Sequence, residues 1–348
     1  MALSIVGCDA VAQKNEVVMK LISSSLIKKP IDGYCVMKKL GDKPVLCSIF
    51  TSNDSIVLTS LDSLKSSFLT FPKGSLKIIN SDDFSLVDSV LWFYSEEQSK
   101  VLKISASSPE EQTFPFPDSL AIWGKPLLFE SFIFGHVLFK ENVLDIGTHY
   151  EYVRHANMFR YNCEDGKLVL FGSYPENYKR NFFADYWGEL TWAGQKPPLL
   201  ISSYSFSDSV ETYSLSDLSR KVLWMGSSES SIQNIPDEYF DNYHRENQHF
   251  MSSGNYDMLS YNALTNEFLR VYYTGIQDLS VDYLPERQTV VRNLLIFDGD
   301  FQFKYEFKFP NQRFDYFQLE YYGNKVYALR KDSNNDFMVD IFLLEFDN

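Results

Sequence analysis

Cations and aromatic side chains are concentrated in one region of an otherwise acidic chain. Arg154 and His155 come first, and Tyr178, Arg180 and Trp187 follow within the next turn-rich segment. Guanidinium groups form charge-assisted hydrogen bonds with anions, and aromatic rings offer flat faces for stacking. A few such polar groups among aromatic rings are typical of small-molecule sites. These five residues therefore predict a surface that binds an anionic or carbohydrate ligand.

The alternative interpretation of this region is architectural. The same cations would then form ordinary ion pairs with Glu164, Asp165 or Asp185 within a strand-rich core. Side chains along a strand alternate between its two faces, so the five residues converge only if loops bring them to the same end of the fold. The position of those loops decides between the two interpretations.

Two further motifs resemble metal sites but lack essential features. His244 and His249 are five residues apart, which on a helix turns them about 140° from each other, whereas a zinc-protease helix spaces its histidines by four. The segment from Asp332 to Asp336 alternates oxygen ligands as a calcium loop does, but Phe337 occupies the glycine position and Leu343 the position of the closing glutamate. We expect a solvated loop and a polar hairpin tip, with no metal and no cofactor.

Carboxylates are abundant as adjacent pairs, which do not supply the geometry of a hydrolase. A glycosidase needs two carboxyl groups about 5 to 10 Å apart across a substrate. Neighbours such as Asp82 and Asp83, or Glu96 and Glu97, are typical of solvated turns. No catalytic residue is predicted, although an acid and a base from distant strands would leave no local pattern.

The N-terminus resembles a bacterial lipobox, in which a cysteine after a short apolar run becomes lipid-modified. The order Ile5-Val6-Gly7-Cys8 fits, but only seven residues precede Cys8 and none of them is Lys or Arg, so a full leader would have to lie upstream. We expect lipidation at Cys8, with residues 1–16 a truncated signal and tether and residues 17–348 one domain. In the alternative, Cys8 is an ordinary small apolar residue.

Two other cysteines lie in one predicted hairpin. Cys35 and Cys47 are equidistant from Gly41, so they could face each other across the strand pair. A disulfide would fit an oxidising compartment, and two buried thiols would fit equally well.

Composition limits the classes of partner. The formal net charge of −14 repels polyphosphates, and the sequence contains no basic stripe, so nucleic acid is not expected as a partner. No apolar run reaches the roughly 20 residues of a membrane-spanning helix. We expect a soluble, monomeric body that associates with a membrane only through a lipid anchor at Cys8.

Short strand-like runs bounded by turn residues fill the chain, and no long stretch has a helical stripe. The clearest hairpin runs from Asn293 to Phe307 around Asp298-Gly299, a pair that favours a tight type I′ turn. Similar hairpins are predicted at 34–50, 90–104, 132–146, 152–171, 210–224 and 258–273. Aromatic residues, 16% of the chain, favour strands as well.

This even distribution predicts an all-β fold, a β-propeller with most likely six four-stranded antiparallel blades. The stretches from Lys325 to Leu329 and from Met338 to Leu343 look like strands of the last blade, and the segment from Val17 to Ile27 is expected to close the ring as an outer strand. A sandwich or jelly roll is the structural alternative, but it does not explain why the hairpins are so evenly spaced.

The sequence resembles uncharacterised lipoproteins of Bacteroides-type bacteria that are related to TolB-like and NHL-like six-bladed propellers. The resemblance rests on the segment from Ile5 to Cys8, on the run from Phe171 to Tyr178, and on the ending from Phe268 to Phe346. It implies a propeller fold and a location in the cell envelope, as an outer-membrane or periplasmic lipoprotein, and it implies no activity.

The function predicted from these features is that of a binding module. A lipid-anchored propeller would hold a small molecule, a glycan or a protein on loops at one face of the ring, because loops on a rigid scaffold carry function and no catalytic motif is present. The alternative is a propeller hydrolase or lyase that acts on an extracellular substrate such as a glycan. A cluster of carboxylate, His or Arg groups with mutually shifted pKa values would favour the enzyme.

Overall fold

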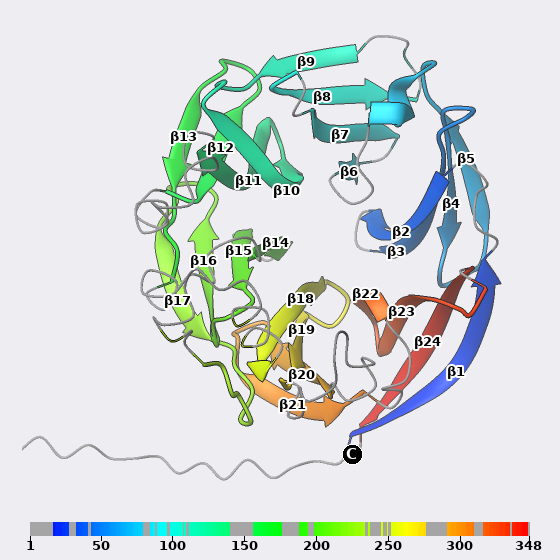
Figure 1. Ribbon diagram of the computed structural model, residues 1–348, viewed down its shortest axis with the longest axis vertical. Helices are drawn as coiled ribbons and strands as arrows, with labels where there is room; N and C mark the ends of the chain where they lie inside the picture. The colour runs from blue at the N-terminus through cyan, green and yellow to red at the C-terminus, as the bar shows by residue number, and fades with distance from the viewer. Residues whose placement is uncertain are drawn as a thin grey trace, which may run out of the picture.

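The computed structural model contains six four-stranded antiparallel sheets arranged as the blades of a ring (Figure 1). It describes residues 17–27, 33–40, 43–78, 84–87, 89–95, 98–106, 108, 111–139, 156–175, 188–193, 198–233, 236, 245, 249, 252–275, 291–309, 316–334 and 336–346. The predicted six-bladed β-propeller is therefore confirmed. Its alternative, a two-sheet sandwich, is wrong.

The first three blades follow one another along the chain, and in each the first strand lies innermost. Blade 1 contains β2 (Gly33–Leu40), β3 (Lys43–Phe50), β4 (Ser55–Ser60) and β5 (Ser66–Thr70). Blade 2 contains β6 (Phe84–Val87), β7 (Val90–Ser95), β8 (Lys100–Ser105) and β9 (Glu111–Pro115). Blade 3 contains β10 (Leu120–Phe129), β11 (Phe132–Phe139), β12 (Met158–Asn162) and β13 (Leu168–Phe171).

Blades 4 and 5 repeat this order, and blade 6 joins the two ends of the chain. Blade 4 contains β14 (Gly188–Ala193), β15 (Leu199–Tyr204), β16 (Ser209–Ser214) and β17 (Arg220–Trp224). Blade 5 contains β18 (Asn255–Asn262), β19 (Glu267–Tyr273), β20 (Arg292–Asp298) and β21 (Phe303–Lys308). Blade 6 contains β22 (Tyr316–Tyr322), β23 (Lys325–Lys331), β24 (Phe337–Phe346) and, outermost, β1 (Val17–Ile27).

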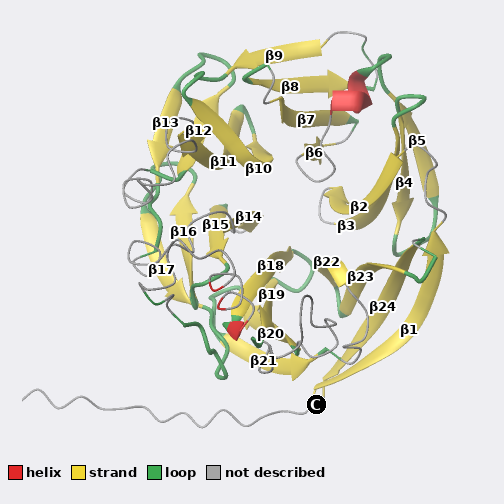
Figure 2. Cartoon of the chain, viewed as in Figure 1, coloured by secondary structure: helices red, strands yellow, loops and turns green. Residues whose placement is uncertain are grey.

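Strands dominate the described residues, as Figure 2 shows, and the short 3-10 helix η1 (Ser75–Ile78) lies between blades 1 and 2. Among the described residues, no helix is long and apolar enough to cross a membrane. The hairpins expected around residues 34–50, 90–104, 210–224 and 258–273 are all present. The strand β11 pairs with β12 rather than with residues 140–146, which lie outside the described residues.

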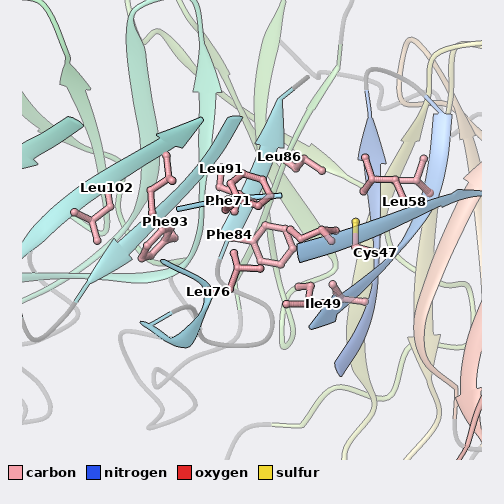
Figure 3. Packing of buried hydrophobic residues seen from close by; sticks show 14 residues of the cluster. Cys47, Ile49, Leu58, Phe71, Leu76, Phe84, Leu86, Leu91, Phe93 and Leu102 are labelled. Atoms are coloured by element: carbon pink, nitrogen blue, oxygen red, sulfur yellow. The ribbon is translucent and has the colours of Figure 1, made fainter. Parts of the chain in front are cut away.

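Each pair of neighbouring blades encloses its own apolar cluster. Blades 1 and 2 bury Cys47, Ile49, Phe84 and Phe93 between them, together with Leu76 of η1 (Figure 3). Corresponding clusters fill the other five interfaces, including the one between blades 6 and 1. Strands in the middle of a blade are buried on both faces, so they carry continuous apolar runs such as β20, rather than alternating ones.

The two cysteines of the first hairpin do not face each other. β2 and β3 are joined by residues 41–42 alone, so Cys35 lies opposite Ser48, and Val36 lies opposite Cys47. A register that differs by one residue moves a side chain to the other face of the sheet. Cys35 therefore contacts blade 6 and Cys47 contacts blade 2, and both are free thiols. Burial raises the pKa of the Cys47 thiol to about 12.

Closure of the ring depends on β1, which pairs with β24 from Val17 opposite Phe346 to Ile27 opposite Phe337. The carboxylate of Asp340, which is 1% exposed, is the polar centre of this blade. It accepts hydrogen bonds from Ser24 Oγ (2.5 Å), Tyr316 Oη (2.7 Å) and Arg330 Nε (2.7 Å). One buried acid thus connects the strand that closes the ring to the innermost strand β22. Burial, together with the hydrogen bond to Asp340, raises the pKa of Tyr316.

Asp340→Asn should lower the free energy of unfolding by about 3–5 kcal/mol, because it leaves the buried Arg330 guanidinium without its counter-charge. Urea unfolding followed by tryptophan fluorescence measures the loss. Ser24→Ala is the matched control. It removes one hydrogen bond to the same carboxylate and should cost only about 1 kcal/mol. A loss below about 1 kcal/mol for Asp340→Asn would contradict this role.

Candidate functional site

The two ends of the ring differ in the length of their connections. Strands alternate in direction, so successive connections alternate between the ends. One end carries the four longest connections in the chain, residues 140–157, 172–187, 225–254 and 274–291, and all of them belong to blades 3 to 5. We call it the loop-bearing end. At the opposite end, the connections within the blades are no longer than five residues, as in 41–42, 163–167 and 215–219.

The end with short connections is held together by polar contacts between innermost strands, and we call it the braced end. Lys39 of β2 reaches past blade 6 to blade 5, where its Nζ donates to the Tyr261 carbonyl oxygen (2.6 Å) and Ser260 Oγ (2.8 Å). The same Nζ lies 3.2 Å from Glu320 Oε2 of β22. Next to this contact, Asn262 Nδ2 donates to the Gly323 carbonyl oxygen. Three successive blades are thereby connected.

A buried arginine supports the loop-bearing end. Arg270 of β19 has no exposed surface, and its guanidinium lies 3.7 Å from the ring centre of Tyr256. Its nitrogens donate to three carbonyl oxygens of blade 4 and the connection that follows it, those of Tyr204 (3.1 Å), Ser207 (2.6 Å) and Met225 (3.0 Å). Arg270 therefore attaches blade 5 to the base of two connections at this end.

Tyr256 continues this support. Its hydroxyl donates to Asp208 Oδ1 (2.5 Å) and accepts from the Ser227 amide (2.8 Å). Burial raises the pKa of Tyr256, so the phenol stays protonated and remains a donor to Asp208. Charge-assisted hydrogen bonds of this kind are stronger than neutral ones. The first residues of the connection 225–254 are held in place by these contacts.

Between blades 3 and 4, the loop-bearing end contains a second buried polar group, which we call the His136–Asn157 niche. Asn157 precedes β12 and is 1% exposed, and its Nδ2 donates to Tyr204 Oη (2.6 Å). His136 of β11 is 8% exposed, and its Nδ1 lies 3.2 Å from the Asn157 carbonyl oxygen. His136 Nε2 and Asn157 Oδ1 are buried and have no hydrogen-bond partner among the described residues. Burial lowers the pKa of His136 to about 4, so the ring is neutral at pH 7.

The five predicted ligand-binding residues all fall in connections of this same end. Arg154 and His155 belong to 140–157, and Tyr178, Arg180 and Trp187 belong to 172–187. All five lie outside the described residues, as does Cys8. The strands that flank the two connections are β11, β12, β13 and β14, and they place the start and end of both connections at the loop-bearing end.

Two acids that could have paired with these cations lie elsewhere. Glu164 and Asp165 are exposed in the turn 163–167, which is at the braced end of blade 3. There Asp165 Oδ1 accepts from the Lys167 amide, while the Glu164 amide donates to Asn162 Oδ1. The third acid, Asp185, lies outside the described residues.

The motifs that resembled metal sites have structural roles where they are described. His249 Nε2 lies 3.2 Å from the Gln233 carbonyl oxygen, and His244 lies outside the described residues. Asp332 Oδ1 accepts from the amides of Asn334 and Asp336, an arrangement that closes the hairpin tip between β23 and β24. Within the described part of the chain, no three His, Cys, Asp or Glu side chains lie close enough together to hold a metal ion.

Sequence reasoning did not identify Arg270, His136 or Asn157. Arg270 carried the clearest signal, because it is a charged residue in the middle of the otherwise apolar run of β19. A charge in a strand that is buried on both faces must have polar partners. His136 and Asn157 carried no signal, since their contact with each other joins residues 21 positions apart and the other partner of Asn157, Tyr204, comes from the next blade.

The stability of the protein should fall as the pH drops from about 6.5 to about 4, because the unfolded His136 binds a proton that the folded state excludes. The contribution of the neutral His136 ring to the free energy of unfolding is fully present above pH 6.5, and it decreases by up to roughly 3 kcal/mol by pH 4. His136→Phe should remove this component. Urea unfolding at pH 7, 5.5 and 4 compares the slopes of the two proteins, and equal slopes would contradict the prediction.

Comparisons with known proteins agree with the fold. No protein-family model matches the chain, and no curated protein does. A solved structure of a member of the DUF4221 family from Bacteroides vulgatus superposes with a TM-score of 0.70 at 13% identity, covering 96% of this chain and 100% of that one. A "putative exported protein" of Bacteroides fragilis gives a TM-score of 0.52 at 11% identity, covering 99% of this chain and 98% of that one. The chain thus shares a propeller fold with these Bacteroides proteins.

Proposed function

We propose that the protein is a binding module of the bacterial cell envelope whose ligand docks on the loop-bearing end, above blades 3 and 4. One observation carries the proposal. The four longest connections all lie at one end of three neighbouring blades, while contacts between innermost strands brace the other end. Loops presented by a rigid frame are the usual location of binding residues.

The residue types in two of these connections indicate the ligand. Arg154 and Arg180 supply forked donors for carboxylate or sulfate groups, and Tyr178 and Trp187 supply aromatic faces. The chain as a whole carries a net charge of −14, so an anion needs local cations of this kind to approach. An acidic carbohydrate combines anionic groups with apolar C–H faces that stack on aromatic rings, and it fits both features.

The location in the envelope is proposed from Cys8, and the direction of β1 determines which end of the ring an anchor at Cys8 would lie near. β1 starts at Val17, opposite the end of β24, at the braced end of the ring. A lipid anchor at Cys8 would therefore attach the chain near its braced end and present the loop-bearing end away from the membrane. The resemblance in fold to a "putative exported protein" of Bacteroides fragilis agrees with this location.

Arg180→Ala should weaken binding of an acidic polysaccharide about tenfold without lowering the melting temperature, because an arginine that pairs with the ligand contributes little to folding. The probe is polygalacturonate, and isothermal titration calorimetry measures its dissociation constant. Trp187→Ala should weaken binding to a similar extent through the loss of ring stacking. Galactan, an uncharged polymer, serves as the reference for the charge effect.

Matched controls separate a specific site from a general effect of charge or aromatic surface. Lys65→Ala removes an exposed cation from the braced end, and Trp224→Ala removes a tryptophan, 55% exposed, from the outer strand of blade 4. Both variants should bind as the wild type does. Equal losses in Lys65→Ala and Arg180→Ala, or no binding of polygalacturonate by the wild type, would contradict the proposal. Shortening of the polymer during the titration would favour the hydrolase or lyase alternative.

Cys8→Ser should abolish incorporation of a labelled fatty acid when the protein is expressed in a Bacteroides host from its complete gene, since the thiol is the atom that carries the lipid. The labelled protein is detected after membrane fractionation. Cys163→Ser is the control and should leave labelling unchanged. Label that persists in Cys8→Ser would rule out this anchor.

A further inference from the structure

The His136–Asn157 niche contains two buried hydrogen-bond acceptors to which no described residue of the chain donates. Within the part of the chain that the structure describes, Asn157 Oδ1 and His136 Nε2 both have no partner, and the two residues are 1% and 8% exposed. Buried polar groups in folded proteins are almost always paired, so each exception calls for a physical reason. Two unpaired acceptors on neighbouring strands at the loop-bearing end are what a donor from a ligand would need.

The hydrogen bonds around the niche determine which atoms are acceptors. The Asn157 carbonyl oxygen can only accept, and His136 Nδ1 lies 3.2 Å from it, so Nδ1 carries the proton. In a neutral imidazole the other nitrogen, Nε2, then presents a lone pair. The Asn157 amide is oriented by its Nδ2, which donates to Tyr204 Oη, and this leaves Oδ1 as the second free lone-pair group.

The surroundings of the niche are aromatic and closely fitted. The ring of Tyr204 packs edge-on against His136 and lies next to Tyr174, each with ring centroids 6.2 Å apart. Gly172 has a positive φ of 75°, and a Cβ on it would come within 2.7 Å of Asn157 Oδ1. The glycine therefore keeps a side chain out of the space beside this oxygen. Gly172 and Tyr174 belong to the connection that carries Tyr178 and Arg180.

The charge near the niche indicates what kind of donor fits. The acid whose charge acts on Tyr204 is Glu211, which accepts from Tyr213 Oη and pairs with Arg220 Nη2, so its charge is already compensated. An ammonium group would place an unpaired charge against two neutral acceptors in a buried position, which is costly. A hydroxyl group donates a hydrogen bond and brings no charge. The niche thus favours a neutral donor.

We propose that the His136–Asn157 niche binds a hydroxyl group of the ligand, and that the ligand is therefore a polyhydroxylated carbohydrate rather than a simple anion. The inference rests on the proposed binding function, because it places the niche beside the connections that would hold the acidic groups of the same ligand. Those connections select for charge. The niche selects for the hydroxyl groups that distinguish a sugar from other polyanions, since a site built around a hydroxyl discriminates against ligands that lack it.

The test compares two polyanions of matched charge density, one with hydroxyl groups and one without them. Oligogalacturonate should bind the wild type at least about tenfold more tightly than oligoacrylate of the same charge. His136→Phe replaces the ring with an apolar one of similar size, and it should remove this preference while binding of oligoacrylate stays unchanged. His249→Phe, which alters a histidine with the same 8% exposure that is bonded to Gln233, should retain the preference.

A second measurement does not depend on any variant. The chain has five histidines, so the ring nitrogens can be assigned by NMR in protein labelled with 15N. The resonance of the non-protonated His136 Nε2 should shift on addition of oligogalacturonate, as expected when a lone pair accepts a hydrogen bond, and should not shift with oligoacrylate. This readout would report the contact even if His136→Phe failed to fold.

The outcomes separate this inference from the proposed function. Equal affinity of the wild type for the two polyanions, or an unchanged His136 Nε2 resonance at saturation with oligogalacturonate, would overturn the inference and leave the binding function intact. Failure of both polyanions to bind would overturn the proposed function itself. A preference for oligogalacturonate that persists in a folded His136→Phe protein would show that the hydroxyl selectivity arises outside the niche.

Discussion

The structure depends on one constraint, which is that a four-stranded blade has two apolar faces and cannot bury both of them alone. A soluble sheet normally turns one face to water, but the middle strands of these blades are apolar on both sides. Each face is covered by the next blade, and six clusters fill the six interfaces. The arrangement is complete only when blade 6 contacts blade 1. Pairing of β1 with β24 completes blade 6, the buried Asp340 stabilises it, and the apolar cluster between blades 6 and 1 closes the ring.

The two ends of the closed ring also differ in their contacts. At the braced end, Lys39 contacts residues of two other blades, and this requires the innermost strands to keep a fixed spacing. At the loop-bearing end, Arg270 and Tyr256 hold the first residues of the connection 225–254. Long insertions in surface connections cost little free energy when their ends are fixed. Such a frame lets the connections differ in sequence without a change of fold.

Much of this architecture could be predicted from the sequence, because a hairpin is a local structure. The segment from Val17 to Ile27 was expected to close the ring, and it does so as β1. Register was harder, since symmetry about Gly41 placed Cys35 opposite Cys47, whereas the turn 41–42 shifts the pairing by one residue. The type I′ turn predicted at Asp298-Gly299 was also wrong. The connection has four residues, Phe301 rather than Gly299 has the positive φ, and Asp298 Oδ1 caps it by accepting from two amides.

The candidate site could be predicted only in part, because some of its contacts join residues that are far apart in the sequence. Cations and aromatics in two connections are visible as composition, and the strand ends of blades 3 and 4 bring those connections to one end of the ring. The buried polar groups at this end of the ring leave no such trace in the composition. Arg270 contacts carbonyl oxygens 45 to 66 positions away, and Asn157 contacts Tyr204 47 positions away. No local pattern in the sequence encodes such pairs, because each residue fits the backbone of its own segment whether or not the distant partner is present. These contacts exist only once neighbouring blades have packed against each other, so in this fold the polar groups that could select a ligand are products of blade packing.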